Sequence, residues 1–299
     1  MIKTDCVIIG AGIAGLTAAI YLKRANVDFM IIEKSAPGGV LNRTSKVDNY
    51  PGVMNTDGVE LAMKIYEQVQ QLEVNYHYGD VKKIVLENNQ KKIITEKEEI
   101  QAKTIIVASG RIPRELGLPN EKSLIGRGIS WCAICDGYMY KDKTVGVVGS
   151  GNSAFEEALY LANIAKEVYL LYNSQKILAE ETLFNKIKET KNIKLVPDLQ
   201  IKELIKDEKL KGIRLTNDQT IDLEGLFLFI GYEPLLACIK ELDIKRDNGY
   251  LVVDQKMMTS IPGIFACGDV IKKDVYQLTT ASGEAAIAAT FVKKHLDLQ

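Results

Sequence analysis

Apolar residues in this chain gather in short runs, and one order of runs occurs twice. Residues 5–10 contain the apolar run Cys-Val-Ile-Ile and are typical of a buried parallel strand, and an Ala/Leu-rich helix follows to about residue 24. A second apolar strand is expected over residues 29–32. The same order recurs as residues 144–149, a helix to about residue 163, and residues 168–172. The repeat predicts two βαβ units built on parallel sheets.

Each unit also has later segments that return to it. Residues 104–110 and 226–231 are apolar strands that end in Gly/Pro turns, and short alternating strands, such as 91–95 and 213–216, lie between them. An apolar strand at 264–269 and an Ala-rich helix over 282–295 close the chain. We therefore expect an α/β protein with two Rossmann-like, three-layer ββα domains, the second inserted into the first. The expected segments are 1–114, 115–241 and 242–299.

Composition narrows the class of protein. The 299 residues suffice for about two domains with their own cores, and 46% apolar and 26% charged residues fit a globular enzyme. A net charge of −1 gives no electrostatic support for a nucleic-acid partner. No run approaches the ~20 apolar residues of a membrane helix. The first strand begins so near Met1 that no signal peptide is expected, which favours a cytoplasmic location.

A glycine-rich turn joins the first strand to the first helix. It reads GAGIAG from Gly10 to Gly15, and the second strand ends at Glu33. Glycines at this spacing let the backbone approach a pyrophosphate, whose charge the helix N-terminus stabilises. A carboxylate at the strand end accepts hydrogen bonds from a ribose diol. Together these features predict a dinucleotide site, although Glu33 alone would also fit a solvated strand end.

Cys132 and Cys135 are the only closely spaced pair among five cysteines. Their spacing permits a disulfide that opens and closes without large backbone motion. The alternatives are half of a zinc site or two buried thiols, but zinc needs a second Cys/His pair, and the remaining candidates stand alone: Cys6, Cys238, Cys267, His77 and His295. A redox pair is favoured and no metal is expected. Asp136, beside the pair, is a candidate for general acid–base work or a turn residue.

Over its whole length the chain resembles the low-molecular-weight thioredoxin reductases. The resemblance lies in the Gly10–Gly15 turn, Gly38–Gly39, Asp48–Gly52, Ser130–Gly137 and Gly263–Val270. It implies that residues 1–114 and 242–299 bind FAD and that residues 115–241 form an NAD(P)H-type domain carrying the redox pair. It further implies that thioredoxin, or a thioredoxin-like protein, accepts the electrons, and that the enzyme is a homodimer.

The resemblance also assigns roles to single residues. Cys132 is expected to attack the partner's disulfide, and Cys135 to lie nearer the flavin. The residues expected to contact FAD lie in the glycine turns, at strand ends and at the start of the last helix: Gly10, Gly12, Ile13, Ala14, Gly15, Glu33, Lys34, Gly38, Gly39, Val40, Leu41, Asn49, Val81, Ala108, Gly110, Gly268, Asp269, Gln277 and Leu278. Val40 and Tyr276 depart from the Gln and Arg usual in the family, which should alter contacts at the flavin edge without preventing FAD binding.

The second glycine turn, which runs from Gly149 to Ala154 as GxGxxA, lacks the residues that select a nicotinamide nucleotide. Tyr172 occupies the position equivalent to Glu33, so no carboxylate stands there to hold the ribose of NADH. NADPH requires arginines for its 2′-phosphate. The family places them at positions occupied here by Asn173, Ser174 and Leu178, and Lys176 is the only nearby cation. Losing two or three charge-assisted hydrogen bonds would weaken NADPH by about 3 kcal/mol, roughly a hundredfold.

In lacking these groups the chain resembles the ferredoxin-dependent flavin thioredoxin reductases of clostridia. We therefore expect a thioredoxin-disulfide reductase that passes electrons from ferredoxin through FAD and the Cys132–Cys135 disulfide to thioredoxin. Two alternatives stay open. One is an NAD(P)H-dependent thioredoxin reductase with atypical nucleotide specificity, and the other is a non-enzymatic, redox-sensing flavoprotein.

Overall fold

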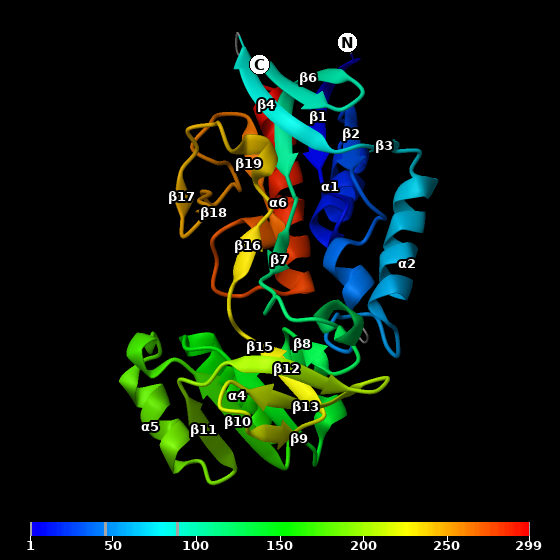
Figure 1. The fold of residues 1–299 in the computed structure, drawn as a ribbon. Coiled ribbons are helices and arrows are strands. Elements are labelled where there is room, and N and C mark those ends of the chain that lie inside the picture. The colour runs from blue at the N-terminus through cyan, green and yellow to red at the C-terminus, as the bar shows by residue number, and fades with distance from the viewer. Residues whose placement is uncertain (1, 45–46, 88–89, 299) are drawn as a thin grey trace. The chain divides into compact units, whose positions relative to one another are not determined.

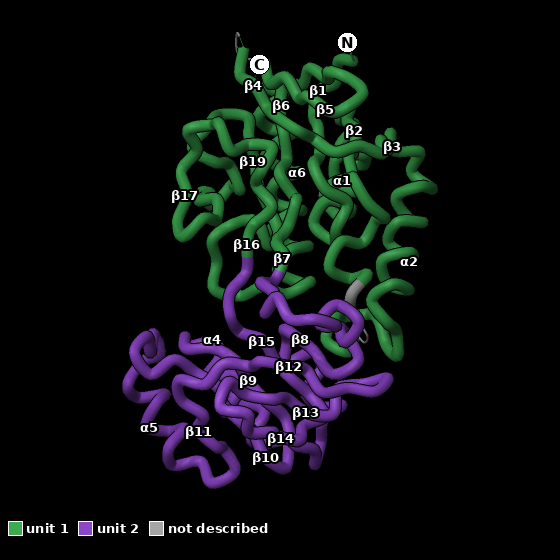
Figure 2. The backbone as a smooth tube through the Cα atoms, viewed as in Figure 1, with its two compact units in different colours: residues 1–112, 233–299 green, residues 113–232 purple. Residues whose placement is uncertain are grey.

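Two compact units make up the chain in the computed structural model, which describes residues 2–44, 47–87 and 90–298 (Figures 1 and 2). Unit 1 comprises residues 1–112 and 233–299, and unit 2 comprises residues 113–232. The expected α/β class, with one Rossmann-like unit inserted into another, is confirmed. The chain returns to unit 1 after Tyr232, earlier than the expected crossing near residue 241, because Leu236, Cys238 and Ile239 are buried in the unit 1 core.

Unit 1 is built on one sheet with the strand order β3-β2-β1-β6-β5-β4, in which β19 also pairs with β6. Its parallel strands are β1 (Ile2–Ile9), β2 (Phe29–Glu33), β3 (Asn75–Tyr78), β6 (Glu99–Val107) and β19 (Ile264–Ala266). Strands β4 (Val81–Glu87) and β5 (Gln90–Thr95) add an antiparallel ribbon along the first half of β6. Long β6 thus belongs to the parallel sheet and to the antiparallel ribbon.

Alternate residues of β1 enter two separate cores. Ile8 packs with α1 (Ile13–Arg24) and α6 (Leu278–Leu296), which lie side by side (Figure 1). Val7 faces the core on the opposite side, together with residues of β4 and β5. Burial on both faces explains why the strand is apolar throughout. Among the described helices, which include α2 (Gly58–Gln71), none is long and apolar enough to cross a membrane.

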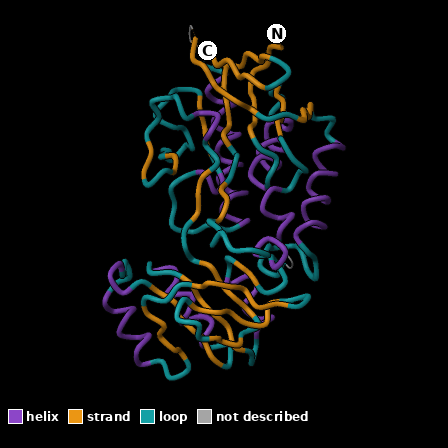
Figure 3. Tube along the Cα trace, viewed as in Figure 1, coloured by secondary structure: helices purple, strands orange, loops and turns teal. Residues whose placement is uncertain are grey.

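Unit 2 repeats the arrangement on a smaller scale (Figure 3). Its parallel sheet has the order β11-β10-β9-β15-β8, formed by β11 (Ile193–Pro197), β10 (Glu167–Tyr172), β9 (Thr144–Val148), β15 (Gly225–Leu228) and β8 (Ile129–Ser130). One core packs the sheet against α4 (Asn152–Ala162) and α5 (Glu181–Glu189). The other core packs it against a second, antiparallel sheet of β12 (Ile201–Lys206), β13 (Leu210–Leu215) and β14 (Thr220–Asp222).

The two crossings between the units run next to each other. Strand β7 (Arg111–Pro113) leaves unit 1 and strand β16 (Tyr232–Pro234) returns to it, and the two pair as a ribbon. Backbone hydrogen bonds extend the pairing on both sides, from Arg114 N to Gly231 O at 3.0 Å and from Leu235 N to Gly110 O at 2.9 Å. The inserted unit therefore begins and ends at neighbouring points of its host.

Gly15 fixes how closely α1 approaches β1. A Cβ atom at this position would lie 1.9 Å from the carbonyl oxygen of Gly10. The contact is with backbone, so no change of rotamer relieves it. Gly10 itself has φ +102°, and its Cβ would lie 2.5 Å from the carbonyl oxygen of Ala108. The turn between strand and helix is therefore closed to any side chain at these two positions.

Gly15→Ala is expected to destabilise unit 1 by about 3 kcal/mol, because the helix must move off the strand to admit one methyl group. Gly283→Ala, also inside a helix, is the matched control, because its Cβ meets nothing within 4 Å. The control should be neutral or should stabilise α6 by up to about 1 kcal/mol. Urea unfolding of both variants measures the difference, and equal stability of the two would contradict the steric argument.

Candidate functional site

Helix α1 presents the donors that a bound phosphate group needs. Its N-cap residue, Gly12, contributes no side-chain hydrogen bond to the first turn. The first N–H groups of the helix, at Ile13, Ala14 and Gly15, therefore stay available to an anion. The backbone of Gly38 crosses the same turn and donates to Ala11 O at 2.8 Å.

Glu33 lies at the end of β2 with its carboxylate turned toward this turn. The residue is only 8% exposed, and its Oε2 accepts a hydrogen bond from Ala11 N at 2.7 Å. Oε1 accepts from the backbone N and the hydroxyl of Ser35, both at 2.8 Å. A nearly buried carboxylate needs such donors. Ala11 N and Ser35 thereby fix the orientation of the Glu33 carboxylate, whose remaining lone pairs can accept hydrogen bonds from a ribose diol.

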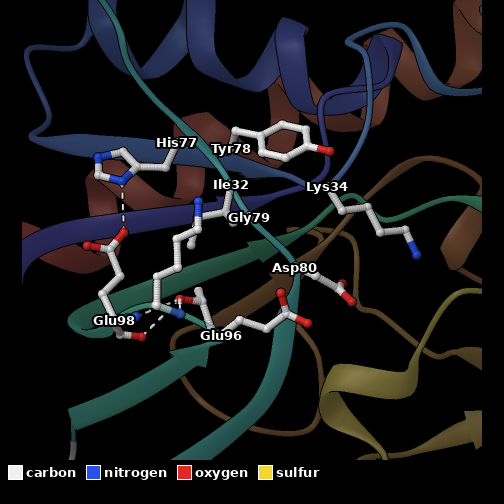
Figure 4. A pocket seen from close by; sticks show the side chains of 10 residues that line it. Ile32, Lys34, His77, Tyr78, Gly79, Asp80, Glu96 and Glu98 are labelled. Atoms are coloured by element: carbon white, nitrogen blue, oxygen red, sulfur yellow. Dashed lines mark hydrogen bonds and ion pairs between the residues drawn. The ribbon is translucent and has the colours of Figure 1, made fainter.

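A pocket opens beside the next residue, Lys34, at the ends of β2 and β3 (Figure 4). Lys34 and Asp80 border it on one side, and the ion pair between His77 Nδ1 and Glu98 Oε1, at 2.9 Å, borders it on the other. Val81, expected near FAD, follows Asp80 directly and is buried as the first residue of β4. The structure thus brings Lys34 and Asp80 to one rim of the pocket, while Val81 does not line it.

Residues far apart in sequence meet where the resemblance places the flavin. Asn49 Nδ2 donates to Gln277 Oε1 at 3.1 Å, although 228 residues separate them. Gln277 is the N-cap of α6 and forms a capping box with Thr280. The Gly39–Arg43 segment, a short 3-10 helix, carries Val40 exposed and Leu41 buried. These contacts place the predicted flavin residues Asn49 and Gln277 side by side.

Asp269 lies beside two cations, Arg111 and Lys273, neither of which was predicted from the sequence as part of the site. Arg111 Nε lies 3.4 Å from Asp269 Oδ2, and Lys273 Nζ lies 3.6 Å from Oδ1. Lys273 also pairs at 2.8 Å with Glu284, whose carboxylate accepts from Gly268 N at 2.9 Å. Burial raises the pKa of Glu284, and the nearby Lys273 opposes that rise. The network fixes Asp269 at the start of the segment leading to α6.

Tyr276 is the second residue where the chain departs from the family pattern, and it has a defined partner. The guanidinium of Arg111 stacks on its ring at 3.6 Å from the centroid. Burial is also the main cause of the raised pKa of Tyr276, followed by the neighbouring Tyr250. A cation therefore lies beside this position after all, supplied by Arg111 of β7.

These features of unit 1 fit a dinucleotide such as FAD. The uncapped N-terminus of α1 suits a pyrophosphate, and the anchored carboxylate of Glu33 suits a ribose diol. The remaining expected residues lie along the same strand ends: Ala108 and Gly110 after β6, Gly268 before Asp269, and Leu278 at the start of α6. Their contacts with FAD stay a prediction.

Cys132 and Cys135 of unit 2 form a disulfide, with their Cα atoms 5.3 Å apart. Cys132 is the N-cap of the short helix α3 (Ala133–Asp136), and Cys135 N donates to Cys132 Sγ at 3.2 Å. A backbone N–H aimed at a sulfur stabilises a thiolate there. The geometry therefore distinguishes the two sulfurs in favour of charge on Cys132.

Ser130 connects Asp136 to the disulfide, a role that no sequence pattern predicts. Its hydroxyl donates to Asp136 Oδ2 at 2.6 Å and accepts from Cys132 N at 3.1 Å. The serine is only 5% exposed, so these hydrogen bonds are largely screened from water. Burial raises the pKa of the nearby Tyr140 to about 12, and the charge of Asp136 adds to the rise.

The other three cysteines are buried thiols without a disulfide partner. Burial raises the pKa of Cys6 to about 12 and that of Cys238 to about 11, and it also raises the pKa of Cys267. Such thiols stay protonated and react slowly at neutral pH. In the described parts of the chain, no group of three or more His, Cys, Asp or Glu side chains comes together as a possible metal site.

The second glycine turn keeps the backbone geometry of the first. Gly149 N donates to Leu171 O at 3.0 Å, as Gly10 N donates to Ile32 O at 2.9 Å. Helix α4 also begins at a glycine, Gly151, with no side-chain cap among the described residues. The tyrosine that replaces the strand-end acid, Tyr172, turns its ring onto the aromatic rings of Phe155 and Phe184.

Glu157 of α4 is a half-buried acid, and no described residue donates a hydrogen bond to its Oε2. Burial raises its pKa from 4.5 to about 7, with a smaller contribution from Glu156. The folded state therefore holds the proton more tightly than the unfolded chain does. Its contribution to stability is complete below pH 4.5 and is lost as the pH rises through about 7.

Glu157→Gln should abolish this pH dependence of the free energy of unfolding. The glutamine amide does not ionise, so no buried negative charge forms as the pH rises. The variant should match the native protein near pH 5 and exceed it near pH 8, by on the order of 1–3 kcal/mol. Urea unfolding at both pH values measures the effect. Glu189→Gln, an exposed acid at the end of α5, is the control and should shift neither value; a similar gain in both variants would rule out burial as the cause.

Comparison with known proteins identifies relatives along the whole chain. Residues 4–286 match the family model described as pyridine nucleotide-disulphide oxidoreductase. A thioredoxin reductase of Ureaplasma parvum is 43% identical over 98% of this chain and 96% of its own. The crystal structure of a thioredoxin reductase from Streptococcus pyogenes superposes with a TM-score of 0.93 at 38% identity and covers 99% of both chains.

The similarity to a ferredoxin-dependent enzyme, which is expected from the sequence to be the strongest, is lower than the similarity to these two thioredoxin reductases. The crystal structure of a ferredoxin-flavin thioredoxin reductase from Clostridium acetobutylicum is 27% identical, with a TM-score of 0.56 over 99% of both chains. The prediction that the chain is most like that group is therefore not supported. The chain lacks arginines at Asn173, Ser174 and Leu178 although the thioredoxin reductases reported above are more similar to it than this ferredoxin-dependent enzyme is.

Proposed function

The chain belongs to the pyridine nucleotide-disulphide oxidoreductase family, among the low-molecular-weight thioredoxin reductases, and from this premise we propose how its electrons travel. It is a thioredoxin-disulfide reductase with FAD as its cofactor. In our proposal unit 1 holds FAD, unit 2 binds a reduced nicotinamide nucleotide, and Cys132 delivers the electrons to thioredoxin. The Cys132–Cys135 disulfide, with a backbone N–H directed at one of its sulfurs, is the observation that supports this most strongly.

The reaction is balanced by one nucleotide for each disulfide. A hydride leaves the nicotinamide with two electrons, one proton is taken up from solvent, and the disulfide of thioredoxin becomes two thiols. FAD, when bound, supplies the relay between the two-electron donor and the Cys132–Cys135 disulfide. Ala11 N and Ser35 hold the Glu33 carboxylate that would bind the FAD ribose, and the first turn of α1 would hold the pyrophosphate.

In the exchange step, Cys132 is the nucleophile. Once the pair is reduced, the N–H of Cys135 stabilises the Cys132 thiolate, which attacks one sulfur of the thioredoxin disulfide and forms a mixed disulfide. Cys135 then attacks Cys132 Sγ, so that the internal disulfide forms again and the second thioredoxin sulfur leaves. Asp136, held by the Ser130 hydroxyl, is positioned to carry the proton for the leaving thiolate.

The surface around the disulfide suits a protein acceptor. Ile134, between the two cysteines, is 53% exposed, and Tyr138, just after them, is 73% exposed. Met139 adds a third exposed apolar side chain. Apolar and aromatic side chains of this kind are enriched where protein partners dock. Trp131, by contrast, packs against the core under the antiparallel sheet of unit 2.

Cys135→Ser should trap thioredoxin, and Cys132→Ser should not. In the first variant Cys132 can form the mixed disulfide but no second thiol resolves it. The adduct is measured by non-reducing electrophoresis and mass spectrometry, and turnover should vanish in both variants. Cys238→Ser, which removes a buried thiol, is the control and should turn over normally. Trapping by Cys132→Ser instead would reverse the two roles.

The donor is tested by anaerobic turnover of thioredoxin with NADH, NADPH and reduced ferredoxin, each supplied alone. We expect turnover with at least one nicotinamide nucleotide and little with ferredoxin, because the backbone of the second glycine turn is intact. Turnover with ferredoxin alone would overturn the donor class and would restore the ferredoxin-dependent alternative. The disulfide chemistry would be unaffected by that result.

A further inference from the structure

The carboxylate missing from the strand end of unit 2 is supplied by the neighbouring strand. Asp198 directly follows β11, and its N donates to Tyr172 O, the last residue of β10, at 2.8 Å. Its Oδ1 accepts from Ser174 N at 2.7 Å, and its Oδ2 accepts from the Ser174 hydroxyl. The side chain is exposed, and φ is +58°, a left-handed conformation that aspartate adopts at a small cost.

Unit 1 provides the template for this arrangement. Ser35 lies two residues beyond the end of β2 and donates its N and its hydroxyl to Glu33, as Ser174 does to Asp198 two residues beyond the end of β10. The strands also share one register, because Glu33 pairs with Tyr78 and Tyr172 pairs with Pro197.

The residue of unit 1 at the place of Asp198 is Gly79. Its N donates to Glu33 O at 2.9 Å, as Asp198 N donates to Tyr172 O. In unit 1 the acid therefore ends the second strand and a glycine follows the third. In unit 2 a tyrosine ends the second strand and the acid follows the third. The serine two residues beyond the second strand, Ser35 in unit 1 and Ser174 in unit 2, donates to the carboxylate in both units, so the serines are equivalent and the acids differ by one strand.

We propose that Asp198 binds the adenosine ribose of the nucleotide and makes unit 2 selective for NADH over NADPH. This inference rests on the proposed function, because it assumes that unit 2 binds a nicotinamide nucleotide. Each oxygen of Asp198 keeps a second acceptor position, which suits the 2′- and 3′-hydroxyls of a ribose. NADPH carries a phosphate dianion in place of the 2′-hydroxyl, and Asp198 repels it.

The charges nearby favour the same nucleotide. The two hydrogen bonds from Ser174 lower the pKa of Asp198, so its carboxylate is ionised at neutral pH. Between residues 172 and 180 the only Lys or Arg is Lys176, and Glu180 adds an acid beside Asn152 at the start of α4. A 2′-phosphate needs charge-assisted donors. At this strand end the structure places the carboxylate of Asp198 instead.

The test is calorimetric binding of NAD⁺ and of NADP⁺ to the oxidised, FAD-loaded protein, which requires no turnover. NAD⁺ should bind at least about tenfold more tightly than NADP⁺. Asp198→Asn keeps an oxygen for Ser174 N but removes the charge, so NAD⁺ should weaken about tenfold while NADP⁺ holds or improves. Asp207→Asn is the control, because Asp207 also accepts a backbone N–H in an exposed turn of unit 2, and it should change neither affinity.

The outcomes separate this inference from the proposed function. Tighter binding of NADP⁺ by the native protein would overturn the role of Asp198 and leave the donor class intact. Binding of neither nucleotide would overturn the donor class as well. An equal loss for both nucleotides in Asp198→Asn would show a structural role and would also overturn the inference. The ratio for the native protein needs no variant, so the test holds even if Asp198→Asn folds poorly.

Discussion

The glycine turn and the end of β2 in unit 1 are arranged around one constraint, the negative charge of Glu33 at the end of a buried parallel strand. Strand β2 is buried along its whole length, so only its end can present a polar group. A carboxylate there requires donors, because an unpartnered buried charge costs several kcal/mol. Ala11 N and Ser35 supply them, which ties the glycine turn to the strand end. The close approach of α1 through Gly15 and the position of Glu33 thus depend on one another.

Most of the fold could be predicted from the sequence, because buried strands and alanine-rich helices leave periodic patterns. Residues 144–149 and 168–172 proved to be strands β9 and β10 within one or two residues. Helix α6 begins four residues before its expected start at 282, since Gln277 and Thr280 cap it, and no apolar period marks a cap. The return to unit 1 comes earlier than the sequence predicts, because Cys238 and Ile239 are buried in the unit 1 core and a short apolar segment carries no period that assigns it to a unit.

The site was predictable only where its residues are contiguous. The Cys132–Cys135 pair and the Gly10–Gly15 turn are motifs of fixed spacing, and spacing is what a sequence displays. Ser130 gave no such signal, because its importance lies in the direction of one hydroxyl. Asp198 stands 26 residues beyond Tyr172, and only the pairing of β10 with β11 brings it to the strand end. At the position equivalent to Glu33 the sequence therefore shows a tyrosine and no acid, whereas in the folded sheet Asp198 lies at the end of the neighbouring strand, β11.

The paired crossings β7 and β16 have a consequence for synthesis on the ribosome. Residues 233–299 contain β19, which pairs with β6, and α6, which packs on α1, so the host cannot complete its sheet until they emerge. By then the whole of unit 2 has left the exit tunnel and can fold, since domains fold as units during translation. The inserted unit thus matures before the unit that contains it. Because β7 pairs with β16, the two ends of the insert lie together, so the host chain resumes next to the point at which it was interrupted.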